Sequence, residues 1–394
     1  MVRWGEPVLG LMDERERPSV QAAMAPKRGE GPAAEFEVSV IVPARDEERT
    51  LPGCLESLLR QTEPGFALGR QWEVVVVDDG STDRTRVVAE DLFAAEVARE
   101  PGRSTGLVVL EAPAWEAGPD GLGGSEMTGK SAACWAGAGV ARGTWLLFTD
   151  ADTVHEAGSV SRSLREAERH GVAMLSYSPR QVVKGLLQRT VMPLIFSELA
   201  SVYPPAKVND VGDPLAAANG QFLLVEREAY FDAGGHRGVG MNVVEDVALS
   251  RSIKRAGKAI RLRAAPEALS ARMYATTGEM VAGWTKNLAS LMPSPVSLAL
   301  WRVLDMLLLV GLPVIAVAWP GLIWWQRGAL WLVWARTLLR FYTRVARAHA
   351  GVLDTAISPL GLPLFVVLLL RSTVQHRVRR EVVWKGRRYN PNRH

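Results

Sequence analysis

Two carboxylates separated by one small residue stand directly after an apolar stretch of strand length. The stretch is Trp-Leu-Leu-Phe-Thr at 145–149, and the carboxylates are Asp150 and Asp152. Buried strands of α/β sheets end at the edge where ligands bind, and the backbone turns just beyond, so both side chains can face one divalent cation. Their oxygens suit Mg²⁺ or Mn²⁺ and leave room for the phosphates of a substrate. Ordinary turn residues are the alternative interpretation.

Two more predicted strands end in acidic residues. The apolar stretch 36–43 is followed by Asp46 and Glu47, and the stretch 73–77 is followed by Asp78 and Asp79. Apolar strands that alternate with amphipathic helices predict a mostly parallel sheet, in which the strands end at a common edge. Acids from three strand ends would therefore meet there and form one site.

A further acidic pair, Glu245 and Asp246, opens a predicted helix that stops at Gly257. Acids in the first turn of a helix often interact only with the helix dipole. The functional hypothesis is that one of the two is a general base that points into the cleft.

A lysine at the start of another predicted helix could attract a phosphate. Gly129, Lys130 and Ser131 begin a helix that ends near Arg142, and unpaired N–H groups there point the same way as the ammonium. Together with Gly124 they match the phosphate-loop pattern, but a long loop separates them from the preceding strand, which argues against a P-loop NTPase. No glycine-rich fingerprint follows the first strand, which argues against a nucleotidyltransferase and an NAD(P) oxidoreductase.

The elements that must position these residues predict an α/β catalytic domain. Residues 1–35 mix Pro, Gly and alternating charge and are predicted to be a poorly ordered leader. Hydrophobic periodicity then predicts the domain over 36–290. The expected strands are 36–43, 73–78, 106–110, 145–149, 172–177 and 220–225, and the expected helices are 51–61, 85–97, 129–142, 157–169, 228–233 and 243–256.

The last quarter of the chain has the composition of a membrane region. Residues 298–394 contain 14 Lys/Arg against three Asp/Glu, although the whole chain has a net charge of only +4. Basic residues that flank apolar runs favour a membrane over nucleic acid. We expect the membrane region at 298–372, with apolar runs at 304–325, 330–342 and 357–370, and a basic cytosolic tail at 373–394. A cytosolic catalytic domain requires an even number of spans, so one run would be re-entrant or interfacial.

Four segments resemble, in order, the landmarks of glycosyltransferase family 2. They are Val-Pro-Ala-Arg-Asp-Glu-Glu within 41–48, Val-Val-Asp-Asp-Gly-Ser-Thr-Asp at 76–83, Phe-Thr-Asp-Ala-Asp at 148–152 and Glu-Asp-Val-Ala-Leu at 245–249. The resemblance covers about 36–260. It implies the Rossmann-like GT-A fold with a mostly parallel sheet, followed here by C-terminal transmembrane helices, and an inverting transfer from a nucleotide-sugar donor.

The same resemblance implies a role for each matching residue. Pro43 and Glu47 would line the nucleotide base, most often uracil, and Asp79, next to Asp78, would bind its edge. Lys130 and Asp150 would lie near the nucleotide. Asp150 and Asp152 would bind a divalent cation, Mg²⁺ or Mn²⁺. Asp246 would be the catalytic base, with Glu245 beside it.

One segment departs from the processive members of the family. They carry Gln-x-x-Arg-Trp where this chain has Gly-Trp-Thr-Lys-Asn at 283–287. This segment, with Trp115 and Trp-Lys-Gly-Arg-Arg-Tyr at 384–389, resembles the branch that acts on carotenoid acids and hopanoids. The acceptor would then be lipid-soluble, beside Gln221, Trp284 and Lys286. The alternatives are processive or cell-envelope polysaccharide synthesis and a non-catalytic membrane scaffold on a degenerate transferase fold.

Overall fold

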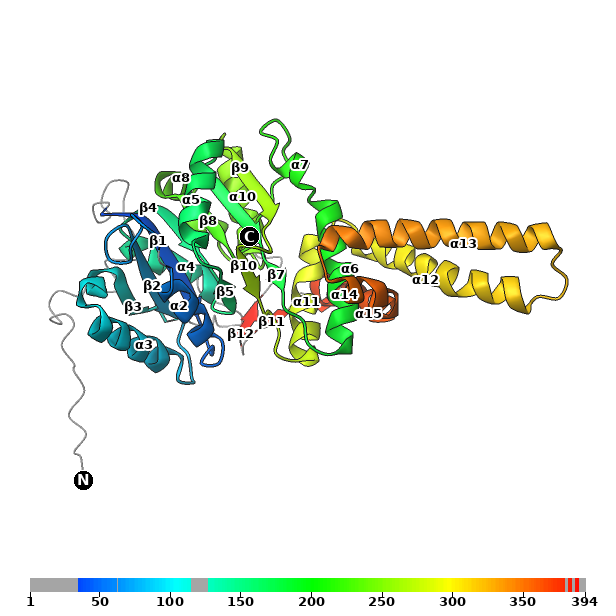
Figure 1. Cartoon of the computed structure of the whole chain (residues 1–394), viewed down its shortest axis with the longest axis horizontal. Helices are drawn as coiled ribbons and strands as arrows, with labels where there is room; N and C mark the ends of the chain where they lie inside the picture. Colours follow the sequence, from blue (N-terminus) through cyan, green and yellow to red (C-terminus); the bar gives the residue numbers. More distant parts are fainter. Residues whose placement is uncertain (1–34, 62, 115–126, 380–381, 385–386, 390–394) are drawn as a thin grey trace, which may run out of the picture.

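A seven-stranded sheet forms the centre of the N-terminal domain (Figure 1). The computed structural model describes residues 35–61, 63–114, 127–379, 382–384 and 387–389. In spatial order the strands are β3 (Leu107–Glu111), β2 (Trp72–Asp78), β1 (Phe36–Ala44), β4 (Gly143–Phe148), β8 (Leu223–Glu226), β6 (Met174–Ser178) and β9 (Ile260–Ala264). The predicted strand positions are confirmed to within a few residues, so acids that follow β1, β2 and β4 share one edge.

Helices cover both faces of the sheet because the strand side chains alternate between two apolar cores. One core joins the Val38, Val40 and Val42 side chains of β1 to α2 (Leu51–Leu59), α3 (Thr85–Arg99) and α5 (Ser159–His170). The other core joins Ile41 of β1 to the helices on the opposite face of the sheet. Those helices are α4 (Gly129–Val140), α8 (Arg227–Asp232), α9 (Gly235–Val239) and α10 (Glu245–Arg255).

One strand differs from the expected parallel arrangement. β8 runs antiparallel to both of its neighbours, β4 and β6, whereas every other adjacent pair in the sheet is parallel. A short apolar run buried on both faces has the same pattern in either direction, so the sequence does not encode this orientation. A small second sheet of β5 (Thr153–His155), β10 (Leu269–Ala271) and β7 (Arg180–Gln181) lies beside the carboxyl edge.

A helical subdomain with its own core adjoins the sheet domain. It contains α6 (Leu186–Val202), α11 (Thr277–Leu291), α12 (Pro295–Ala318), α13 (Trp324–Val345), α14 (Val352–Ile357) and α15 (Leu362–Val374). The short helix α7 (Pro205–Val208), which follows α6, packs on β9 of the sheet domain instead. Short 3₁₀ or π turns occur at Pro101–Gly106, Ala346–Ala348, Ser358–Gly361 and Gln375–Arg379. After α15 the chain returns to the sheet domain, where β11 (Val382–Trp384) pairs with β12 (Arg387–Tyr389).

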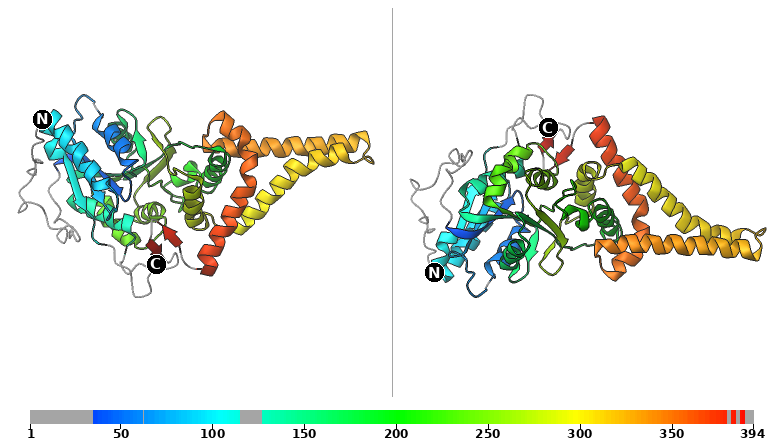
Figure 2. Two further views of the ribbon diagram at one scale, coloured as in Figure 1. Left: turned by 90° about the horizontal axis from the view of Figure 1, so that it is seen from below. Right: turned by 90° about the horizontal axis from the view of Figure 1, so that it is seen from above.

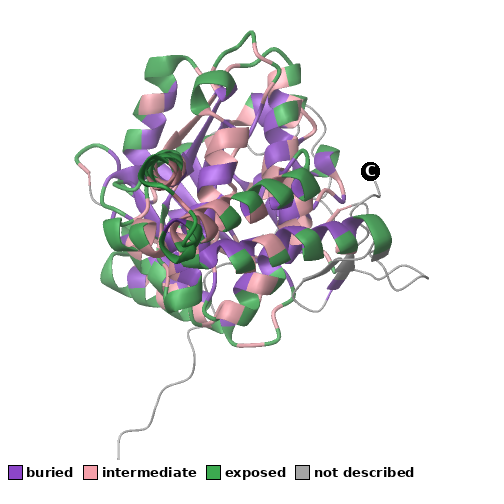
Figure 3. Cartoon of the chain, turned by 90° about the vertical axis from the view of Figure 1, so that its right-hand side faces the viewer, coloured by how far each residue is buried: buried purple, intermediate pink, exposed green. Residues whose placement is uncertain are grey.

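Helices α12 and α13 form a hairpin that projects away from the body of the protein (Figures 1 and 2). The predicted single run at 304–325 is therefore wrong in its bounds, because the chain turns between Ala318 and Trp324. The hairpin is largely exposed (Figure 3), and its apolar side chains face outwards. Two helical segments, Pro295–Ala318 and Val352–Val378, are long and apolar enough to cross a membrane.

Four charged side chains fix the base of this hairpin. Glu198 of α6 lies 3.6 Å from Arg302 and 3.3 Å from Arg344, measured between the carboxylate oxygen and the Nε atoms. Asp305 accepts hydrogen bonds from both arginines. Because these groups are nearly buried, removal of one partner would leave an uncompensated charge.

Candidate active site

Lys130 joins the acids of two distant segments. Its Nζ lies 2.7 Å from Asp150 Oδ1 and 2.9 Å from Glu245 Oε1, so the end of β4 and the start of α10 meet at the start of α4. Thr128 caps α4 by accepting a hydrogen bond from the Ser131 N–H, which fixes the first turn that carries the lysine. The two carboxylates outweigh the effect of burial and raise the pKa of Lys130 well above its ordinary value. The ammonium is therefore a permanent positive charge in the site.

The two acids that open α10 have opposite electrostatic environments. Burial and the adjacent Glu245 charge raise the pKa of Asp246 to about 6, despite hydrogen bonds at 2.8 Å from the N–H groups of Gly220 and Val247. Burial would also raise the pKa of Glu245, but Lys130 and Lys286 outweigh it and lower that pKa to about 2. Asp246 therefore has the proton affinity of a base, and Glu245 stays ionised.

These groups line a single pocket beneath the sheet edge. Asp150, Lys130, Glu245 and Asp246 all border it, and so does Pro43 of β1. Its other lining residues are Cys134, Phe148, Thr149, Gly220, Leu223 and His236. Burial lowers the pKa of His236 to about 4, so this imidazole is neutral there and accepts or donates a 2.9 Å hydrogen bond with the Tyr230 hydroxyl. The structure thus brings five of the residues expected from the resemblance to one pocket, and the other expected residues do not line it.

Asp150 and Asp152 lie in the turn after β4, separated in sequence by Ala151. The hydroxyl of Thr153 donates to the Asp150 carbonyl at 2.7 Å, and the Arg272 N–H donates to the Asp152 carbonyl at 3.2 Å. Among the described residues no group of three or more His, Cys, Asp or Glu side chains is placed as a metal-ligand set. Two carboxylates nevertheless have the oxygen chemistry of a cation site that substrate phosphates complete.

The predicted base-binding residues lie in the loops after β1 and β2, which are tied together. Asp46 accepts a 2.7 Å hydrogen bond from the Thr82 N–H, and the Glu47 N–H donates to the Thr85 hydroxyl at 2.7 Å. The Glu47 carboxylate accepts from Thr50 at the start of α2. Asp78 accepts from the Ser81 N–H at 3.2 Å. The two loops therefore form one rigid wall.

Asp79 has a partner that the motifs did not predict. Arg387, in the tail, donates from Nη1 to Asp79 Oδ2 at 2.6 Å and from Nη2 to the Asp79 carbonyl at 3.3 Å. The sequence predicts a basic cytosolic tail that includes this arginine but gives no partner for it, and in the structure the side chain is buried. A basic tail after apolar runs matches the positive-inside pattern, which hides an arginine of this kind.

The three residues expected on the acceptor side have different surroundings. Gln221 is buried, accepts a 3.0 Å hydrogen bond from Gln181 Nε2, and its own Nε2 has no partner among the described residues. Lys286 interacts electrostatically with Glu245 and Asp246, although it is not among the residues that line the pocket. Trp284 was expected to border the acceptor, but it lies in the protein interior. Its side chain is 2% exposed, and its Nε1 donates to Met192 Sδ at 3.2 Å.

Comparison with known families agrees with this geometry. Residues 39–108 and 124–231 match the model described as "Glycosyl transferase family 2". Over these segments the sheet domain is similar to glycosyltransferase family 2. The matched segments hold Pro43, Glu47, Asp79, Lys130 and Asp150, and α10 with Asp246 follows them.

Sequence relatives extend over nearly the whole chain. A 4,4'-diaponeurosporenoate glycosyltransferase of Staphylococcus haemolyticus (strain JCSC1435) is 26% identical over 379 residues, which cover 92% of this chain and 91% of the relative. The protein of the same name from Staphylococcus aureus (strain USA300) is 25% identical over 366 residues, 90% of this chain and 88% of the relative. The similarity therefore includes the helical subdomain.

Solved structures also resemble the fold. The mannosyltransferase PcManGT from Pyrobaculum calidifontis, in complex with GDP-Man and Mn²⁺, is 15% identical with a TM-score of 0.47, covering 90% of this chain and 92% of that chain. Residues 1–349 of Staphylococcus aureus TarS, in complex with UDP-GlcNAc, are 16% identical with a TM-score of 0.41, covering 90% and 96%.

Proposed function

We propose that this glycosyltransferase transfers a sugar, with inversion, from a UDP-sugar to a lipid-soluble acceptor of the carotenoid type. The observation that carries the proposal is the convergence of Asp150, Lys130, Glu245 and Asp246 in one pocket. The names of the two staphylococcal relatives support the acceptor class. The donor base would meet Asp79 in the wall formed by the loops after β1 and β2.

Asp246 would act as the base. Its carboxylate takes the proton of an acceptor hydroxyl as the acceptor oxygen bonds to the anomeric carbon, and the bond from that carbon to the nucleoside diphosphate breaks. A pKa near 6 suits this task, because the group is ionised at neutral pH but still binds a proton. The charge of Lys130 would stabilise the departing diphosphate.

A divalent cation would be held by Asp150 and Asp152 with the donor phosphates. Bound there, it would neutralise charge that develops on the leaving diphosphate. Lys130 already pairs with Asp150 at 2.7 Å, so the lysine and the cation would share this carboxylate.

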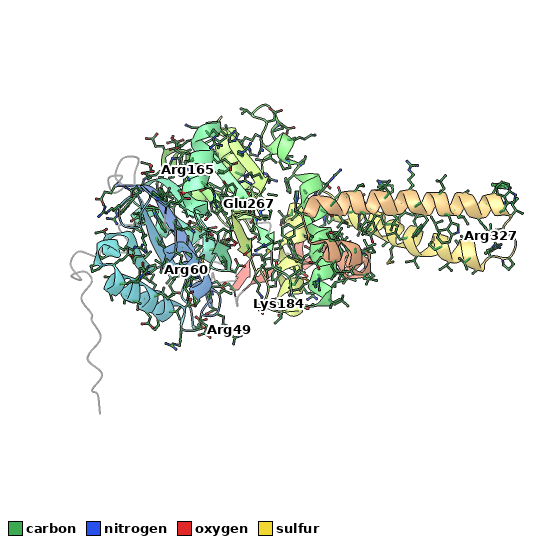
Figure 4. The ribbon with its side chains drawn as sticks, viewed as in Figure 1. Arg49, Arg60, Arg165, Lys184, Glu267 and Arg327 are labelled. Atoms are coloured by element: carbon green, nitrogen blue, oxygen red, sulfur yellow. The ribbon has the colours of Figure 1, made fainter. Side chains whose placement is uncertain are left out.

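The hairpin of α12 and α13 would insert into the membrane. α12 is one of the two segments apolar enough to cross a membrane, whereas α13 contains four arginines and is not. Between Trp324 and Arg344, however, α13 has a length of about 30 Å at 1.5 Å per residue, which matches the hydrocarbon thickness. Exposed Trp319, Trp324 and Trp325 at its far end would lie at the distal interface, beside Arg327 (Figure 4). Two antiparallel spans return the chain to the cytosolic side, where α14 and α15 pack on α6 and α11.

The cost of this insertion is concentrated at Arg336, which is exposed near the middle of α13. A charged side chain at mid-depth costs about 3 kcal/mol on insertion scales, which the apolar surface of the hairpin can offset. Single cysteines at Ile323 and Glu279, in a variant without native cysteines and in sealed inverted vesicles, test the topology. Labelling of the first only after vesicle disruption, and of the second without it, is expected.

Release of UDP by the protein in detergent tests the activity. The substrates are UDP-glucose and a carotenoid carboxylic acid or alcohol, with Mn²⁺, and the glycosylated product is identified by mass spectrometry. The variant D246N is the matched control, because it keeps the shape of the side chain. If D246N turns over as fast as the wild type, the assignment of Asp246 as the base is refuted. If the wild type releases no UDP with any acceptor, a scaffold role is favoured.

A further inference from the structure

An arginine from the end of the chain lies buried on the donor side of the pocket. The side chains of Arg387 and Asp79 are 9% and 7% exposed, and they form a direct ion pair at 2.6 Å. Arg45 donates to the Asp79 carbonyl at 2.7 Å, so two guanidinium groups approach one acidic residue. Burial raises the pKa of Asp79, and the two arginines oppose this shift without cancelling it.

The guanidinium of Arg387 also packs against the start of α4. A Cβ atom added to Gly129 would overlap Arg387 Nη1 and Asp79 Oδ2, so only glycine leaves room for this ion pair. The next residue, Lys130, reaches Asp150 and Glu245. Arg387 and Lys130 thus lie at the positive end of a helix, the first paired with Asp79 and the second with Asp150 and Glu245, so a diphosphate at this turn would meet N–H donors from both side chains.

We propose that Arg387 is a donor-binding residue whose guanidinium contacts the diphosphate of the nucleotide-sugar, while Asp79 holds it in position. The inference rests on the proposed function, since it assumes a nucleotide that extends from Asp79 to Asp150. Such a nucleotide crosses the first turn of α4, where the guanidinium lies. A planar fork of N–H groups matches phosphate oxygens better than a single ammonium does.

The path of the chain explains how a residue so far along the sequence reaches this place. α15 packs against α11, and His376 Nε2 lies 2.7 Å from the Lys286 carbonyl, a geometry in which the ring N–H donates. β11 and β12 follow within a few residues. The segment that delivers Arg387 is therefore anchored to the helix that carries Lys286.

Binding of UDP and of uridine to the full-length protein in detergent, measured by calorimetry with Mn²⁺, tests the assignment. A charge-assisted contact to a phosphate corresponds to about a 10- to 100-fold change in affinity. R387A should weaken UDP by that factor and change uridine binding less than about threefold. R387K should be intermediate, because it keeps the charge without the fork.

Two further variants guard against a trivial result. G129A should weaken UDP in the same direction, since it displaces the guanidinium without removing a charge, and it serves if R387A does not fold. R377A, which removes an exposed arginine of the same tail, should bind UDP as the wild type does. Equal loss of UDP and uridine binding in R387A would reduce Arg387 to a support for Asp79 and overturn the proposal.

The outcomes separate this inference from the proposed function. Unchanged UDP binding in R387A, with a wild type that binds UDP, would refute only the role of Arg387. A wild type that binds neither UDP nor UDP-glucose would refute the proposed donor and the diphosphate contact together.

Discussion

Replacement of Asp246 by asparagine should abolish sugar transfer and make the folded protein more stable above pH 6. Burial and the Glu245 charge raise the pKa of Asp246 from 3.8 to about 6. One pKa unit corresponds to about 1.4 kcal/mol, so the ionised carboxylate lowers the free energy of unfolding by up to about 3 kcal/mol. Because Asp246 keeps some solvent contact, and because the asparagine NH₂ would face the Gly220 or Val247 N–H that now donates to a carboxylate oxygen, we expect D246N to recover at most about 1 kcal/mol.

The pH dependence gives the sign of the effect. A carboxyl group with a raised pKa in the folded state ionises first in the unfolded state, so the wild type loses stability as pH rises from about 4 to about 6. The difference between D246N and the wild type should therefore appear in that window and stay constant above it. Thermal unfolding in detergent from pH 4 to 8 measures it, with an expected rise in Tm across the window of up to about 2–4 °C.

The adjacent acid is a matched control with the opposite sign. The low pKa of Glu245, about 2, means that its charge stabilises the folded protein above pH 4.5, and that this contribution is lost as pH falls through about 2. E245Q should therefore lower the Tm at pH 7. If D246N leaves the Tm unchanged at pH 8, or if both variants shift it in one direction, the electrostatic assignment of the pair is wrong.

Three other predictions follow from burial and charge. With an alcohol acceptor, kcat should fall below about pH 6 as Asp246 is protonated, whereas a carboxylic-acid acceptor, already ionised, should give a flatter profile in the same UDP-release assay. W284A should lower the free energy of unfolding by about 3–5 kcal/mol, because the indole fills a core; a change confined to the acceptor KM would contradict this. Burial raises the pKa of Cys54 to about 12 and that of Cys134 further, so neither thiol should react with iodoacetamide at pH 8 before unfolding, and rapid native labelling would disagree.

Local sequence patterns were sufficient to predict that the acids and Lys130 lie near one another. Each follows an apolar strand or opens a helix, and the rule that parallel strands share a carboxyl edge converts those local positions into proximity. β1 pairs with both β2 and β4, so the loops after these three strands are neighbours. The contact between Lys130 and Glu245 also depends on where α10 packs on the sheet. The hydrophobic periodicity of the sequence does not specify that position.

Longer-range features were not predictable in the same way. Arg387 contacts Asp79 across 308 positions, and a basic cluster in a tail has the same composition whether one member is buried or none. The apolar run at 304–325 contained a usable signal, since Pro320 and Gly321 favour a turn, and the structure turns there. A tryptophan just ahead of an apolar run, as Trp284 is, is typical of an interfacial anchor. Its burial was not predictable because Phe196 of α6, which packs against it, is distant in sequence.

Helix α11 connects the core of the helical subdomain to the candidate site. Trp284 and Leu288 pack into the core shared with α6 and α15, whereas Lys286, between them, interacts electrostatically with the acids of α10. The residues of one helix therefore contribute both to this core and to the charge of the candidate site. An acceptor that leaves the bilayer along α11 would meet Lys286 before Asp246, so a carboxylate acceptor would find a positive charge first and an alcohol would find a base. The balance between these two groups, rather than the sheet edge common to the family, should then decide which acceptor class reacts.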